Sequence, residues 1–245
     1  MMKKVMLITG ASRGIGASVA YESAMAGYFV VINYNKSETE AILLSEKIIK
    51  DGGECKIVKA DISDSSQVKT LCAEALSYSG KIDVLVNNAG ISSFSLFTDI
   101  TDKLWDDTFD INVKGNFYVT RAVVPHMVRE KNGKIINICS IWGICGSSCE
   151  VHYSASKAAV ICMTKSLAKE LGPSNITVNC IAPGVIDTEM NSALSDEDIK
   201  SLCDETPLER IGKPWEIARS VLFLASDDAA FITGQVLSPN GGFLI

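Results

Sequence analysis

Three side chains near the middle of the chain have the types and the spacing needed to transfer a proton to a substrate oxygen. Ser140 is followed thirteen residues later by Tyr153, and Lys157 lies four residues beyond the tyrosine. Residues four apart on a helix share a face, so a helix over 153–172 would place a phenol beside an ammonium. An unperturbed tyrosine has a pKa of about 10 and is a weak acid at neutral pH. A nearby cation lowers that pKa, and Lys157 is placed to supply the charge.

A glycine-rich segment near the start of the chain predicts a phosphate-binding turn. Gly10, Gly14 and Gly16 follow a short apolar run at 5–9 and open a helical pattern at 14–26. Glycines at such a turn let backbone N–H groups and the helix N-terminus approach a pyrophosphate. The spacing differs from G-x-G-x-x-G, and an ordinary strand-to-helix turn is the alternative. Because a strand precedes the glycines and a helix follows, we favour dinucleotide binding, and with the proton donor this indicates a hydride-transfer site.

The end of the second predicted strand bears on the kind of dinucleotide. NAD sites usually carry an acidic residue there, which binds the ribose 2′-hydroxyl. The residues found at this place are Asn33, Tyr34, Asn35 and Lys36. With no carboxylate present, Arg13 and Lys36 would attract a 2′-phosphate, so the sequence predicts NADP(H). The alternative is that Lys36 is only a solvated surface residue and Arg13 only a turn residue.

Strand and helix patterns alternate along the chain and predict its fold. Apolar runs predict buried strands at 5–9, 29–34, 54–60, 82–86, 134–139 and 176–182, with a short final strand at 235–238. Helices are predicted at 14–26 before Gly27, at 37–51 with a Ser37/Glu40 capping box, at 64–79 capped by Asp64, at 101–130 ended or bent by Pro125, at 153–172, and after Pro214. Residues 183–206 are expected to be irregular.

Parallel strands need crossover helices, and those crossovers are right-handed. The pattern therefore predicts one α/β domain over residues 1–245, a Rossmann-type doubly wound parallel sheet of about seven strands with helices on both faces.

Composition narrows the class of protein. The net charge of -6 disfavours a nucleic-acid partner, and no apolar segment approaches the roughly 18 to 20 residues that cross a bilayer. The eight cysteines show no C-x-x-C pair, so we expect them to be reduced and packed, with no metal site, in a cytoplasmic protein. His126 and His152 are the only histidines and make no hydrolytic triad. His152 is expected at the surface or in a first helical turn, pointing about 100° away from Tyr153.

Taken in order, the motifs of the whole chain resemble the short-chain dehydrogenase/reductase superfamily. They are Thr9-Gly10-x-x-x-Gly14-x-Gly16, Asp61, Asn87-Asn88-Ala89-Gly90, Asn112, Ser140, Tyr153-x-x-x-Lys157, Pro183-Gly184 and Thr188. The resemblance implies that Tyr153 protonates a carbonyl oxygen while the nicotinamide delivers hydride, with Ser140 hydrogen-bonded to the same oxygen. It also implies that Lys157 binds the nicotinamide ribose and that Asn112 holds a water that passes protons to Lys157.

Residues and resemblance together define a cofactor-binding set. Within it the resemblance implies that Asp61 and Ile62 contact the adenine, that Asn88 and Gly90 line the ribose, and that Ile186 and Thr188 reach the carboxamide. The full set is Gly10, Ser12, Arg13, Gly14, Ile15, Gly16, Asn33, Asn35, Lys36, Asp61, Ile62, Asn88, Ala89, Gly90, Tyr153, Lys157, Pro183, Gly184, Ile186 and Thr188.

Two closer resemblances leave the substrate open. The full length is similar to 3-oxoacyl-[acyl-carrier-protein] reductases, whereas residues 140–154 resemble reductases that act on 5-aminopentanone-modified elongation factor P. Trp142 and Glu150 are predicted to line the substrate pocket. A carboxylate at 150 suits an ammonium tail and suits an anionic carrier poorly, although it could be a solvated loop charge or favour the helix N-terminus. The basic residues that could dock an acidic carrier are Arg129, Lys131 and Lys134.

The leading hypothesis is an NADPH-dependent ketone reductase of the 3-oxoacyl-[acyl-carrier-protein] reductase-like group. The alternatives are a reductase of the 5-aminopentanone modification and, in a different class, a non-catalytic NADP-binding regulator on the same fold. The expected partner is a ketone, carried on a protein or free as a small molecule. The resemblance also implies a homo-oligomer, either a dimer or a tetramer.

Overall fold

A sheet of seven parallel strands forms the centre of the computed structural model, which describes residues 2–192 and 194–245. The strands are β1 Val5–Ile8, β2 Phe29–Tyr34, β3 Glu54–Lys59, β4 Val84–Asn87, β5 Gly133–Ile138, β6 Ile176–Ile181 and β7 Val236–Leu237. Their order is β3-β2-β1-β4-β5-β6-β7. The predicted doubly wound parallel sheet is therefore confirmed. The strand order reverses between β1 and β4, which is where such sheets form their ligand crevice.

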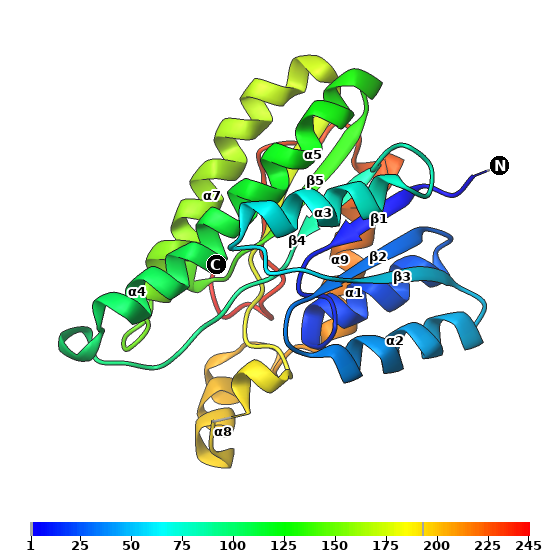
Figure 1. Ribbon diagram of the computed structural model, residues 1–245. Coiled ribbons are helices and arrows are strands. Elements are labelled where there is room, and N and C mark those ends of the chain that lie inside the picture. Colours follow the sequence, from blue (N-terminus) through cyan, green and yellow to red (C-terminus); the bar gives the residue numbers. More distant parts are fainter. Residues whose placement is uncertain (1, 193) are drawn as a thin grey trace.

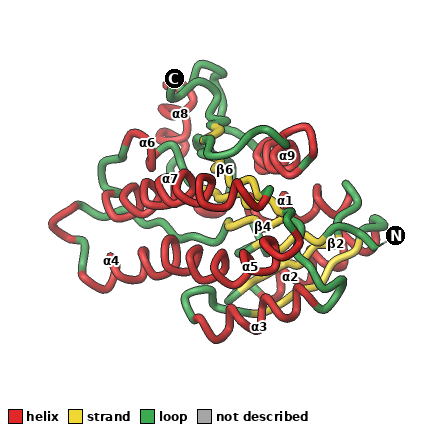
Figure 2. The backbone as a smooth tube through the Cα atoms, turned by 90° about the horizontal axis from the view of Figure 1, so that it is seen from above, coloured by secondary structure: helices red, strands yellow, loops and turns green. Residues whose placement is uncertain are grey.

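Helices cover both faces of the sheet (Figure 1). They are α1 Gly14–Met25, α2 Glu38–Lys50, α3 Ser65–Leu76, α4 Asp102–Phe109, α5 Asn116–Glu130, α6 Trp142–Cys145, α7 Val151–Leu171, α8 Asp196–Glu205 and α9 Pro214–Ala225. A π-helical turn, η2 Asp110–Gly115, joins α4 to α5, and short 3-10 turns lie at η1 Phe97–Asp99, η3 Gly172–Ser174, η4 Glu189–Asn191 and η5 Asp227–Ala229. Seen from above, α3 and α5 lie side by side (Figure 2).

The core consists of two apolar layers, one on each side of the sheet. Alternate residues of β1 illustrate the division, because Met6 and Ile8 pack in the layer shared with α1 and α9. Val5 and Leu7 pack in the layer shared with α3, α5 and α7. Burial on both faces explains why the strands are near-continuous apolar runs rather than alternating patterns. No helix in the described part of the chain is long and apolar enough to cross a membrane.

A ladder of buried polar side chains crosses the second of these layers. Asn87 of β4 donates to Asn137 of β5 at 2.9 Å and to Thr120 of α5 at 3.0 Å. Asn137 in turn donates to Thr164 of α7 at 2.8 Å. These side chains are at most 4% exposed, so the bonds satisfy groups that water does not reach. We call Asn87, Asn137, Thr120 and Thr164 the polar ladder, and it joins the sheet to α5 and α7.

The predicted capping box at the start of α2 is wrong, although the predicted boundary is right. Ser37 does precede α2, but its side chain makes no capping hydrogen bond, so the predicted capping box with Glu40 does not form. Of the two effects predicted for Pro125, ending the helix is excluded because α5 continues to Glu130, and bending stays a prediction. A proline removes one backbone hydrogen bond from a helix, and the burial of Val123 and Met127 against the sheet holds the turn despite that loss. The predicted cap at Asp64 is confirmed, since it accepts from the backbone N–H of Ser66.

The segment predicted to be irregular, residues 183–206, contains η4 and helix α8. This helix lies away from the sheet in Figure 1 and has no buried residue. Its apolar stripe is short, consisting of the half-buried Ile199, Leu202 and Cys203, so it gives only a weak helical signal. Its start is marked by a capping box in which Ser195 and Asp198 exchange hydrogen bonds. The helical stretch predicted at 101–130 is confirmed, and within it the π-helical turn η2 separates α4 from α5.

Candidate active site

Helix α7 carries Tyr153 and Lys157 on one face of its first two turns. Both side chains are buried, at 8% and 4% exposure, and the Lys157 Nζ lies 5.6 Å from the centre of the tyrosine ring. The ammonium donates to the carbonyl oxygen of Ile138, the last residue of β5, at 2.9 Å. This bond fixes the lysine at the carboxyl end of the strand, where doubly wound sheets bind their ligands.

Ser140 lies two residues beyond β5 and faces the tyrosine. Its hydroxyl accepts from the backbone N–H of Trp142 at 3.2 Å and lies close enough to the Tyr153 phenol to lower the pKa of that phenol. The side chain is 8% exposed. The structure therefore brings a hydroxyl, a phenol and an ammonium together at one strand end, although Ser140 and Lys157 are seventeen positions apart.

Asn112 lies in the π-helical turn η2 and connects three elements. Its Oδ1 accepts from the N–H of Ile91 at 2.8 Å, and its Nδ2 donates to the Ile91 carbonyl and to Ser156 of α7, each at 3.0 Å. A methyl group added at Gly90 would lie 3.2 Å from both Asn112 Oδ1 and Lys157 Nζ. The bare glycine thus leaves open the space between the amide and the ammonium.

Burial dominates the ionisation of the two helix residues. It raises the pKa of Tyr153, the charge of Glu150 raises it further, and the nearby Ser140 hydroxyl acts in the opposite direction. Burial likewise lowers the pKa of Lys157. The sequence predicts a lowered pKa for Tyr153, whereas the pKa in the fold is raised. The reason is that lost hydration penalises the phenolate more than neighbouring groups stabilise it. The phenol therefore keeps its proton at neutral pH.

The predicted phosphate turn lies at the carboxyl end of β1 and is closely packed. A Cβ at Gly16 would lie 2.4 Å from Asn88 Nδ2 and 2.6 Å from the Gly10 carbonyl oxygen, so only glycine fits. The Asn88 amide donates to the carbonyls of Thr9 and Gly10 at 3.0 and 2.9 Å. The end of β4 is thereby joined to the turn after β1, across the point where the strand order reverses.

The residues predicted to select the dinucleotide have different surroundings. Asn33 is buried, accepts from the Gly10 N–H at 3.2 Å and donates to the Ala60 carbonyl at 3.0 Å, so its amide supports the turn from beneath. Asn35 and Lys36 are exposed beside it. Arg13 forms an ion pair with Glu189 at 3.0 Å, with both side chains at least 60% exposed.

The remaining predicted cofactor residues line the same edge of the sheet. Burial pushes the pKa of Asp61 upward, but hydrogen bonds from the Ser63 hydroxyl and N–H outweigh it and hold that pKa below its usual value. Ile62 is buried against Gly115 at the end of η2. The other members of the set occupy three turns: Ser12, Gly14 and Ile15 after β1, Ala89 after β4, and Pro183, Gly184, Ile186 and Thr188 after β6.

The two predicted substrate residues lie close in sequence to Ser140 and Tyr153. Trp142 is half-buried, and its ring meets that of Phe243 edge-on with centres 5.5 Å apart. Glu150 is 5% exposed and accepts from the Ser92 hydroxyl. The solvated-charge alternative for Glu150 is therefore wrong. Glu150 occupies the N-cap position of α7, the place that the helix-dipole alternative requires, although its side chain makes no capping hydrogen bond.

Sequence reasoning missed the contribution of the segment after β4. His152 is in the first turn of α7, as predicted, but it is fully buried rather than at the surface, and its Nε2 pairs with the Ser93 hydroxyl at 3.0 Å. Ser92 and Ser93 come one residue after the Asn-Ala-Gly motif, and that position was the available indication that they approach the site.

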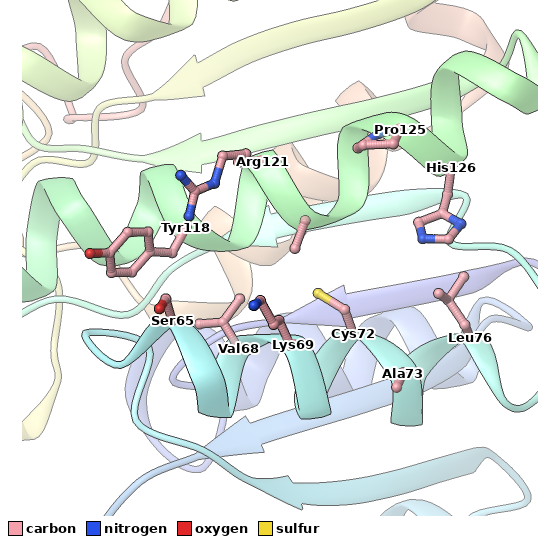
Figure 3. Close-up of a pocket in the computed structure, with 11 residues that line it drawn as sticks. Ser65, Val68, Lys69, Cys72, Ala73, Leu76, Tyr118, Arg121, Pro125 and His126 are labelled. Carbon is pink, nitrogen blue, oxygen red and sulfur yellow. The ribbon is translucent and has the colours of Figure 1, made fainter.

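Two hollows lie outside the group formed by Ser140, Tyr153 and Lys157. One, of about 420 Å³, is a groove between α3 and α5 in which Lys69 and Leu76 face Tyr118 and His126 (Figure 3). It contains none of the predicted site residues. The second, of about 320 Å³, is lined by Thr188 and the residues around it and adjoins the predicted carboxamide contact.

Comparison with known proteins agrees with this geometry. Residues 10–244 match a family model described as enoyl-(acyl carrier protein) reductase. The chain is 44% identical over 241 residues to a 3-oxoacyl-[acyl-carrier-protein] reductase of Staphylococcus epidermidis, covering 98% of this chain and 99% of the relative.

Proteins of the same name from more distant bacteria are also similar. The Thermotoga maritima protein is 41% identical over 244 residues, covering 99% of this chain and 98% of the relative. The Synechocystis protein is 42% identical over 243 residues, with 99% and 97% covered. The chain belongs to the short-chain dehydrogenase/reductase family and is an oxidoreductase that acts on ketone or alcohol groups with a nicotinamide cofactor.

Proposed function

We propose that the protein is an NADPH-dependent reductase of 3-oxoacyl thioesters carried on an acyl-carrier protein. The observation that carries the proposal is the convergence of Ser140, Tyr153 and Lys157 at the carboxyl end of β5. The relatives named above support the substrate class, since their names specify a 3-oxoacyl group on a carrier protein.

The site fits a dinucleotide. The turn after β1 has no room for a side chain at Gly16, and the bare face of Gly90 opens toward Lys157, so backbone atoms line both ends of the crevice. Gly10, Gly14 and Gly16 would hold the pyrophosphate, and Lys157 would hold the nicotinamide ribose. When bound, the cofactor supplies the hydride that reduces the carbonyl carbon.

The side chains of this protein complete the reaction at the carbonyl oxygen. Ser140 donates a hydrogen bond to that oxygen and stabilises the negative charge that develops on it. Tyr153, which burial keeps protonated, transfers its phenolic proton to the same atom as general acid. Lys157 offers a cation that stabilises the phenolate left behind, and Asn112 holds a water in the open space beside Gly90 that returns a proton.

Replacing the acid tests the mechanism. Tyr153→Phe removes only the phenolic hydroxyl, and we expect turnover of an acetoacetyl thioester to fall at least a hundredfold while NADPH binding, followed by fluorescence, is retained. A crotonyl thioester serves as the comparison substrate and should not be reduced. Wild-type turnover by the phenylalanine variant would refute the assignment. If the wild-type protein itself bound NADPH but reduced no ketone, the non-catalytic regulator would be favoured instead.

The preference for NADPH is a separate part of the proposal. No carboxylate follows β2, Lys36 is exposed there, and Arg13 is held only by a solvent-exposed ion pair with Glu189. Such pairs contribute little, so a 2′-phosphate can displace the carboxylate. Lys36→Glu should weaken NADPH binding about tenfold and leave NADH binding nearly unchanged. Equal or tighter binding of NADH by the wild-type protein would refute the preference.

One observation favours a second candidate substrate. Glu150 is 5% exposed, three residues before Tyr153, and no ion pair within residues 2–192 and 194–245 involves it. A buried carboxylate favours a substrate with an ammonium group, such as the 5-aminopentanone modification of elongation factor P.

A direct comparison separates the two candidates. The rates of NADPH oxidation with an acetoacetyl thioester and with aminopentanone-bearing elongation factor P are measured side by side. Glu150→Gln should reduce kcat/KM for the cationic ketone by at least tenfold more than for the thioester. An equal effect on both substrates would exclude ammonium recognition by Glu150.

A further inference from the structure

The segment immediately before Tyr153 lacks the usual local supports of a helix start. Glu150 occupies the N-cap position of α7 but makes no side-chain cap, so the first-turn N–H groups gain nothing from it. Cys149 has a φ of +60°, the left-handed region that is unfavourable for residues other than glycine. Contacts from elsewhere in the fold must therefore hold this segment in place.

Those contacts come from one short segment, residues 91–95, which follows β4. The Ser92 hydroxyl donates to Glu150 Oε1 at 2.5 Å, and the Ser93 hydroxyl pairs with His152 Nε2 at 3.0 Å. The N–H of Ser95 also donates to the Cys149 carbonyl at 2.8 Å. Three successive contacts thus attach residues 91–95 to the four residues that precede the tyrosine.

Burial makes the two side-chain contacts important. Glu150 is 5% exposed and His152 is fully buried, so neither can replace a lost partner with bulk water. The other ring nitrogen of the histidine, Nδ1, has no hydrogen-bond partner within the described residues. Without the Ser93 hydroxyl, both imidazole nitrogens would be unpaired in the interior, which proteins strongly avoid.

The same segment is fixed at its other end by the catalytic framework. Ile91 exchanges two hydrogen bonds with Asn112, which also donates to Ser156, and the Ser156 hydroxyl donates to the Tyr153 carbonyl at 2.7 Å. Tyr153 is therefore supported on both sides along α7, by the contacts of residues 149–152 before it and by Ser156 after it. Because a displacement of about 1 Å can reduce a rate a hundredfold, this support bears directly on proton transfer.

We propose that Ser92, Ser93, Glu150 and His152 form a latch that positions the Tyr153 phenol, making the two serines and the histidine positioning residues for the reaction. The inference rests on the proposed function for its kinetic consequence. The latch itself is a structural property. It can therefore be tested by the local stability of the first turn of α7, which is measured without any turnover.

Matched variants test the latch. Ser93→Ala should lower kcat for an acetoacetyl thioester about tenfold while the KM for NADPH changes less than twofold. Thr98→Ala, in an exposed turn of the same connection, is the control and should have wild-type kinetics. His152→Gln keeps a polar end near the Nε2 position and should retain most of kcat, whereas His152→Leu, of comparable size, should lose it.

A double variant and an activity-independent measurement complete the test. Ser93→Ala combined with His152→Leu should be no slower than His152→Leu alone, because the two changes remove one contact. Hydrogen exchange followed by mass spectrometry should show faster exchange at residues 149–157 in Ser93→Ala than in Thr98→Ala.

Additive losses, or equal exchange in Ser93→Ala and Thr98→Ala, would overturn the latch. Absence of turnover in the wild-type protein would instead refute the proposed function, and the exchange rates would still decide for or against the latch.

Discussion

Replacement of Asn112 by alanine should destabilise the fold as well as slow the reaction. The resemblance gives this residue only a role in holding a water, but the structure shows its amide bridging three elements. It pairs with the N–H and the carbonyl of Ile91 and with the hydroxyl of Ser156. The residue is 2% exposed, so alanine would leave these groups without a partner and without room for bulk water.

The size of the effect follows from the number of bonds. Three hydrogen bonds are lost, and at about 1 kcal/mol each the free energy of unfolding should fall by about 3 kcal/mol. For a domain of this size, each kcal/mol lowers Tm by about 2 to 4 °C, so Tm should fall by about 6 to 12 °C.

Thermal unfolding at one fixed protein concentration measures this difference, because self-association would otherwise change Tm. Asn132→Ala is the matched control, since Asn132 is exposed and precedes β5, at the opposite end of that strand from Ser140. A Tm for Asn112→Ala within about 1 °C of the control would refute the reasoning, because a water-holding residue alone need not support the fold.

Three further predictions concern single residues. Gly16→Ala places a methyl group within 2.6 Å of the Gly10 carbonyl oxygen and should weaken NADPH binding, measured by fluorescence titration, at least tenfold; unchanged affinity would contradict the close turn. Arg210 holds the pKa of Glu216 down at about 2, so stability from this pair is present above the usual pKa and is lost as pH falls toward 2. Allowing for solvent screening of a partly exposed pair, Glu216→Gln should cost about 1 kcal/mol in urea unfolding at pH 7 and nothing near pH 2. Glu150→Gln removes a charge that raises the pKa of Tyr153, so the alkaline fall in kcat should move to lower pH, and a shift to higher pH would contradict this sign.

The fold was largely predictable because burial on both faces of the sheet leaves a clear record in the strands. Runs such as residues 29–34 are apolar apart from Asn33, and this run is followed by a turn and a helical pattern. The failures are local. Ser37 has the residue type for a capping box but not the backbone geometry, and the apolar stripe of helix α8 is limited to Ile199, Leu202 and Cys203. The π-helical turn η2 has no characteristic period, although it carries Asn112.

For the candidate site, the sequence predicted which residues lie together better than it predicted their ionisation or the contacts that support them. Residue spacing placed Tyr153 and Lys157 on one helix face, because helical geometry is regular. The ionisation of Tyr153 could not be read in the same way, since it depends on burial produced by the whole fold. The burial of His152 depends likewise on a serine 59 positions earlier in the chain. Contacts of that separation leave no periodic pattern in a single sequence.

The polar ladder has a consequence for how the strands find their alignment. Asn87 and Asn137 are paired residues of β4 and β5, and both point toward the layer that contains Thr120 and Thr164. A slip of β5 by one position would turn Asn137 into the apolar layer on the other side of the sheet. Each amide stranded in this way would cost about 1 to 3 kcal/mol, whereas isoleucines exchanged between two apolar layers would cost far less. The ladder therefore discriminates against misaligned sheets that hydrophobic burial alone would tolerate, and it does so in the strand that presents Ser140.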